Sequence, residues 1–93
     1  MKLVWSRQAK ADMRAIHDQI AADYPIAAKA VIGRIRNAAL QLETFPELGM
    51  PLADMPAFML IEGRRGYRII YEVETDKGIV RVLYVIHPRR DRP

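Results

Sequence analysis

The hydrophobic positions at the start of the chain change from a short continuous run to a helical spacing. Residues 2–5 form the run, which predicts a short strand. The run ends at Ser6, a residue type favoured at helix N-caps. After it, apolar residues recur every three or four positions, at Ala9, Met13, Ile16 and Ile20. This spacing places one apolar stripe on a helix of roughly 17 residues.

A second helix is predicted to begin at Pro25. Proline cannot continue the preceding helix, but it fits the first turn of a new one, so the two helices form a hairpin. The apolar face of the second helix is predicted to hold Ala28, Val31, Ile32, Ile35, Ala38, Ala39 and Leu42. The polar side chains predicted to face water are Lys29, Arg34, Arg36, Asn37 and Gln41.

The second half of the chain has the pattern of strands. Three prolines and a glycine interrupt residues 45–56, which we interpret as one long irregular loop. Three segments follow, at 57–62, 67–74 and 79–87, separated by short turns. They are rich in β-branched and aromatic residues, which favours strands.

The order of elements is β-α-α-β-β-β, typical of an α+β fold. The hairpin of helices is predicted to pack on one face of a small, mostly antiparallel four-stranded sheet, leaving the other face open. Alternation along 67–74 places Arg68 on the open face, and we expect Arg81 of the next strand to join it there. The alternation also predicts packed positions within the sheet for Tyr67, Tyr71 and Tyr84.

Length and composition limit what such a chain can be. Its 93 residues, 51% of them hydrophobic, predict a single domain over 1–93. The absence of cysteine excludes disulfide scaffolds and thiol chemistry, and we find no motif for a metal or any other cofactor. No apolar run is long enough for a signal peptide or a membrane span, so we expect a cytoplasmic protein with no membrane contact.

Positive charge is concentrated near the C-terminus. The net charge is +4, and residues 61–93 hold eight Lys or Arg against five Asp or Glu. Two clusters stand out: Arg64, Arg65 and Arg68, then Arg89, Arg90 and Arg92. Two interpretations stay open, a surface for an acidic or phosphate-bearing partner and an ordinary solvated surface.

Several segments resemble a known family in their order. The run GYRIIYEV at 66–73, the strand ending HPRRD at 87–91, the start WSRQAKADM at 5–13 and the loop FPELGMPL at 45–52 are similar to the RelE/ParE superfamily of toxins. The resemblance covers nearly the whole chain. It implies a bacterial type II toxin that is neutralised by a cognate antitoxin, with which it forms a hetero-oligomer.

The superfamily has two branches with different targets. RelE-like members cut mRNA on the ribosome and carry two lysines, six and eight residues before the tyrosine of the Gly-Tyr-Arg signature. Those positions are Ile61 and Met59 here. The resemblance therefore favours the ParE branch, whose members inhibit DNA gyrase without cutting nucleic acid. Arg64, Arg65, Arg68, Arg81, Arg89 and Arg90 are then candidates for binding the antitoxin or the target.

The alternative is a ribosome-dependent mRNA interferase with Arg68, His87 and Arg90 as its catalytic residues. An imidazole can act as acid or base near neutral pH, which keeps this interpretation open. Against it, His87 is equally explained as the end of a strand with local hydrogen bonds. Arg68 is equally explained by an ion pair with Glu72 or Glu62. A third interpretation is a drifted member that retains only antitoxin binding.

Overall fold

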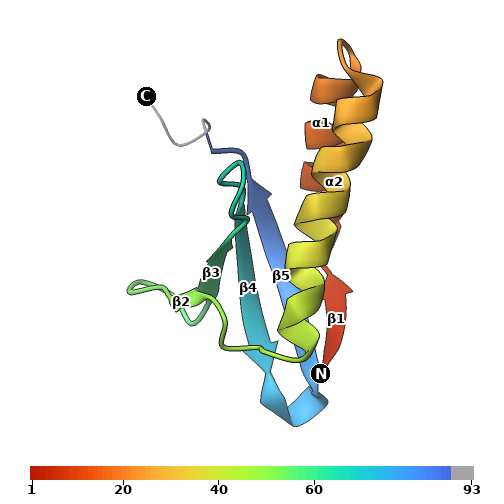
Figure 1. Ribbon diagram of the computed structural model, residues 1–93. Coiled ribbons are helices and arrows are strands. Elements are labelled where there is room, and N and C mark those ends of the chain that lie inside the picture. The colour runs from red at the N-terminus through yellow and green to blue at the C-terminus, as the bar shows by residue number, and fades with distance from the viewer. Residues whose placement is uncertain (89–93) are drawn as a thin grey trace.

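A computed structural model describes residues 1–88 as two helices packed on a mixed sheet (Figure 1). The helices are α1 (Arg7–Ala21) and α2 (Pro25–Leu40), followed by a short 3-10 helix, η1 (Gln41–Glu43). The strands are β1 (Lys2–Trp5), β2 (Met50–Pro51), β3 (Phe58–Ile61), β4 (Arg68–Glu74) and β5 (Ile79–Ile86). A second 3-10 helix, η2 (Thr75–Lys77), turns the chain from β4 into β5. The predicted α+β class and order of elements are confirmed.

The sheet has five strands rather than the four predicted. Its order is β1-β5-β4-β3-β2, with β1 parallel to β5 and the other neighbours antiparallel. The additional strand, β2, lies in the segment that we interpreted as irregular. Met50 pairs with Met59 and Pro51 pairs with Phe58. A strand of two residues that includes a proline has no periodicity, so the hydrophobic pattern could not indicate it.

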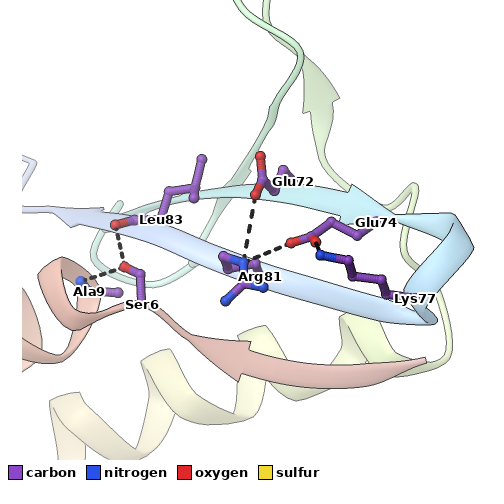
Figure 2. Close-up of polar contacts among 7 residues, drawn as sticks. All are labelled: Ser6, Ala9, Glu72, Glu74, Lys77, Arg81 and Leu83. Carbon is purple, nitrogen blue, oxygen red and sulfur yellow. Dashed lines mark hydrogen bonds and ion pairs between the residues drawn. The ribbon is translucent and has the colours of Figure 1, made fainter.

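The starts of both helices follow from local chemistry. The Ser6 hydroxyl caps α1 by accepting the Ala9 N–H at 3.0 Å, and it also donates to the Leu83 carbonyl of β5 at 2.9 Å (Figure 2). One side chain thus starts the helix and fixes it to the sheet. Pro25 begins α2 as expected, and Tyr24 before it provides no side-chain cap.

The core lies between the helices and the face of the sheet that they cover. The helices contribute small and aliphatic side chains, and the sheet contributes Tyr67, Ile69, Val82 and Val85. A second cluster is formed by Leu42 of η1, Tyr71 and Val80, with Phe58 packed against it. Tyr67 and Tyr71 are 3% and 0% exposed, which confirms their predicted packing.

A bulge in β5 changes which face its last residues occupy. Tyr71 pairs with Val82 and Ile70 pairs with Tyr84, so Leu83 is an extra residue between the two pairs. The insertion places Tyr84 opposite Ile70, on the face away from the helices, where it is 43% exposed. The prediction that Tyr84 is packed like the other two sheet tyrosines is therefore wrong. Strict alternation from Val82 would have placed it under the helices.

Two carboxylates bind backbone N–H groups at the β1 side of the sheet. Beyond the end of β1, Asp12 of α1 accepts the Val85 N–H at 2.9 Å, and Glu43 of η1 accepts the Leu3 N–H at 2.8 Å. Each satisfies a group that would otherwise lack a strand partner. These contacts close an edge that could pair with another chain.

Candidate functional site

The positions that the family resemblance singled out do meet, on the face of the sheet away from the helices. We call this the open face. Ile61 of β3 and Ile86 of β5 lie directly opposite Arg68 of β4, and Met59 lies two residues from Ile61 on the same face. Arg68 is therefore surrounded by apolar side chains at the positions where RelE-like toxins carry lysine.

Arg81 lies on the open face with Arg68, as alternation predicts, but its charge is taken up by carboxylates. Its guanidinium binds Glu74 at 2.7 Å and lies 3.7 Å from Glu72, while Lys77 lies 3.5 Å from Glu74 (Figure 2). The Ile70–Tyr84 pair separates this network from Arg68. Positive charge on the open face is thus partly neutralised at one end.

The contact with Arg81 lowers the pKa of Glu74 from its ordinary value of 4.5, chiefly through the side-chain hydrogen bond. Because the folded-state pKa is below the unfolded one, this carboxylate stabilises the fold above about pH 4.5, and the contribution is lost as pH falls through the folded pKa. We expect Arg81→Gln to return the pKa towards 4.5 in an NMR titration, and Lys77→Gln to change it less. An unchanged pKa in Arg81→Gln would contradict this assignment.

The turn between β3 and β4 is held by a buried acid. Glu62 is only 5% exposed, and its carboxylate accepts the N–H groups of Arg64 at 3.1 Å and Arg65 at 3.0 Å. Gly66 completes the turn at a φ of 81°, a conformation that glycine adopts readily. The result is a turn fixed by hydrogen bonds, in which the consecutive residues Arg64 and Arg65 have exposed side chains.

His87, just after β5, lies on the covered side of the sheet. Its ring meets Tyr67 edge to face, with centroids 5.3 Å apart. Since Ile86 faces Arg68 across the ladder, the register puts Arg68 and His87 on opposite faces of the sheet. Of the proposed nuclease set, these two are therefore not brought to one place. Arg89 and Arg90 lie outside the described residues.

A hollow of about 730 Å³ opens where the arginine turn meets the helical hairpin. We call it the turn hollow. Its walls are the end of α1, the start of α2, the turn and the end of β5, with Arg64, Arg65, Tyr67 and His87 among the lining residues. The sequence indicated these residues singly but gave no sign that they share a cavity, because the contact depends on how the helices lie over the sheet.

Two further features were missed from sequence. Arg34 of α2, predicted to face water, is half-buried, and its Nε is buried with no hydrogen-bond partner. Arg34 follows Val31, which lines the turn hollow, by three residues, so both lie on one side of α2. This spacing was the available sequence signal for the burial of Arg34. The other feature is a groove of about 880 Å³ along the two helices, where Trp5, Met13 and Ile32 lie among basic side chains: Lys10, Arg14, Lys29 and Arg36.

The described residues include neither a metal site nor a membrane-spanning helix. Within residues 1–88, no three His, Asp or Glu side chains are grouped so that they could hold a metal ion. Neither helix in that range has the length and apolar character to cross a membrane.

Comparisons with known proteins agree with the fold. The family model described as ParE toxin of type II toxin–antitoxin system, parDE, matches residues 3–92. A chain of the chromosomal ParDE system from P. aeruginosa is 22% identical, with a TM-score of 0.82, over 94% of this chain and 95% of that one. A chain of the E. coli RelBE complex is 20% identical, with a TM-score of 0.70, over 96% and 98%.

A chain of the RelBE2 toxin–antitoxin complex from Mycobacterium tuberculosis is 21% identical, with a TM-score of 0.69, over 92% of this chain and 95% of that one. A comparison with curated proteins gave no match. At such identities the solved structures establish the shared fold, and the family model adds the branch.

Proposed function

Since this chain belongs to the ParE toxin family of type II toxin–antitoxin systems, we propose that it arrests growth by inhibiting DNA gyrase and has no bond-breaking chemistry of its own. The observation that carries the proposal is the composition of the open face. Met59 and Ile61 lie beside Arg68 where a nuclease of this superfamily would hold its lysines. An arginine with apolar neighbours suits binding to a protein surface.

The chemistry of RNA cleavage explains why this composition matters. Attack by a ribose 2′-hydroxyl needs a base for that hydroxyl, cations for the crowded phosphate and an acid for the leaving oxygen. Arg68 can provide a cation beside the phosphate, but the isoleucine and methionine next to it on β3 can provide neither acid nor base. His87 could act as either, but it lies on the covered side.

A gyrase assay tests the proposal directly. We expect the purified protein to reduce ATP-dependent supercoiling of relaxed plasmid, and we expect added antitoxin to restore it. Undiminished supercoiling at saturating protein would contradict the proposal. If growth also continues on expression, the outcome favours a drifted member that retains only antitoxin binding.

The second candidate is a ribosome-dependent mRNA interferase, favoured by Arg68 at the family's arginine position and by an imidazole near the end of β5. Primer extension on translated mRNA after induction distinguishes it from the gyrase inhibitor. We expect no new 5′ ends. Cleavage that disappears in both Arg68→Ala and His87→Ala would support the interferase instead.

The similar E. coli RelBE structure is a toxin–antitoxin complex, and we further propose that this chain is neutralised, in a cytoplasmic hetero-oligomer, by a cognate antitoxin. Its acidic residues are expected to contact Arg64, Arg65 and Arg68. The combined Arg64→Glu and Arg68→Glu variant should weaken the complex several-fold or more in a titration, because charge pairs are reversed across the interface. Lys77→Glu, at the other end of β4, is the matched control and should bind normally.

A further inference from the structure

The turn hollow carries positive charge that no ion pair within residues 1–88 neutralises. Arg64 and Arg65 line it, and neither guanidinium has an ion pair or hydrogen bond to another described residue. The nearest acid in sequence, Glu62, uses its carboxylate on the backbone of the same turn. A buried acid thus fixes two arginines in place while leaving their charges available.

A third arginine, Arg34 of α2, lies near Tyr67, which is in the wall of the hollow. The Nε of Arg34 is buried without a partner, although a buried donor normally finds one. Arg34 follows Ala27 and Val31, both in the wall of the hollow, by seven and three residues on α2, so all three share one side of the helix. An unpaired guanidinium nitrogen at this place is costly unless something else accepts its hydrogen bond.

The hydroxyl of Tyr67 is a fourth donor without a partner. Tyr67 is 97% buried and lines the hollow, and its hydroxyl makes no hydrogen bond with any other residue in the range 1–88. Burial raises the pKa of this phenol, while the charges of Arg65 and Arg34 oppose the rise. Both guanidinium groups therefore act on the same hydroxyl, which agrees with their placement around one point.

The start of α2 adds positive potential at the rim. Tyr24 and Ala27 belong to the hollow, and the first turn of α2 has neither a side-chain cap nor an acidic residue. Within the first turn of α2, no carboxylate therefore compensates the positive end of the helix dipole. Beside it, Tyr24 is 68% exposed, so its ring is available for stacking against a planar group.

We propose that the turn hollow is a binding site for a phosphate monoester that carries a planar organic group. A carboxylate is fully bound by one arginine in bidentate geometry, whereas a dianionic phosphate has three oxygens that accept from several donors. The two arginines and the hydroxyl that line the hollow, with Arg34 near that hydroxyl, match the phosphate. The volume of about 730 Å³ is within the range of small-ligand sites.

The site is independent of the proposed gyrase inhibition, which involves the open face on the other side of the sheet. Calorimetric titration of the full chain with adenosine 5′-monophosphate as the probe tests it. We expect saturable binding that is tighter than binding of inorganic phosphate, which lacks the planar group, or of adenosine, which lacks the charge. Absence of saturable binding at millimolar monophosphate would overturn the proposal.

Variants locate the site. Arg65→Ala should weaken binding about tenfold or more, since a hydrogen bond to a charged group is lost. Tyr67→Phe, which removes only the hydroxyl, should weaken it several-fold. Arg36→Ala is the matched control: it removes an arginine of α2 that lines the other groove, and it should bind normally. Equal losses in Arg36→Ala and Arg65→Ala would overturn the proposal, because they would indicate attraction by net charge alone.

An acidic peptide decides between ligand classes. A short peptide that combines aspartate with phenylalanine offers a carboxylate and a planar ring without phosphate. We expect it to bind more weakly than the monophosphate. Tighter binding of the peptide would overturn the phosphate assignment and make the hollow a contact for a protein partner.

Discussion

Replacing Tyr71 by alanine is expected to lower the free energy of unfolding by about 4 kcal/mol, which is most of the stability of a typical small domain. Tyr71 is fully buried, and its ring stacks on Phe58 with centroids 5.3 Å apart. Its hydroxyl donates to the Pro46 carbonyl at 2.8 Å and accepts the Gly49 N–H at 2.9 Å. The substitution removes the ring and both hydrogen bonds to the loop that leads into β2.

Urea denaturation followed by circular dichroism measures this effect, and a second sheet tyrosine provides the control. Tyr84→Ala removes the same atoms from a half-exposed position and should cost about 1 kcal/mol. Tyr71→Phe keeps the ring but leaves the two loop groups unsatisfied, with an expected cost of about 1–3 kcal/mol. If Tyr71→Ala costs no more than Tyr84→Ala, Tyr71 does not hold the loop as we describe.

The same contact explains why the fifth strand was not predicted. Gly49 approaches the sheet so closely that an added Cβ would lie 2.8 Å from the Met59 carbonyl oxygen and 2.9 Å from the Tyr71 ring. The loop residue is therefore placed by a tertiary contact 22 positions away in sequence. Hydrophobic periodicity registers repeated local burial, and it does not register a pair of residues positioned by one hydroxyl.

Much of the fold could be predicted because its signals are local. The cap at Ser6, the proline that begins α2 and the stripe of buried residues on α1 all act within a few positions, and each was confirmed. Arg34 shows the limit of that reasoning. On a helical wheel it belongs to the polar side, but in the fold its Nε is buried. Only the packing of the elements shows that its charge lies near Tyr67.

The candidate site was predictable as a list of residues and not as an arrangement. The family resemblance singled out Arg68, Met59 and Ile61, and the register of β3 on β4 brings these residues together. The sequence also grouped Arg68 with His87, which the register separates onto opposite faces. Which face a residue occupies near the end of β5 depends on the bulge, and alternation alone gives the wrong answer there.

Inserting one alanine between Ile70 and Tyr71, opposite Leu83, is expected to cost more than about 4 kcal/mol and to abolish cooperative unfolding in urea, although it adds a single small residue. The added residue pairs with Leu83, so the bulge is lost and β5 alternates strictly, which moves the side chains after Leu83 to the opposite face. Tyr84 would then point under the helices, and Val85, now 5% exposed, would point to solvent. The hydrogen bond from the Val85 N–H to Asp12 would be lost with it.

Leu83→Ala is the control that separates register from side-chain burial. It keeps the extra residue, so the Ile70–Tyr84 pair and the bond between the Ser6 hydroxyl and the Leu83 carbonyl remain possible. We expect a cost of about 1 kcal/mol and normal unfolding. An insertion variant as stable as Leu83→Ala would show that the end of β5 can change face without penalty. The bulge would then not be what holds Tyr84 on the open face and Val85 in the core, because either register would satisfy the sheet.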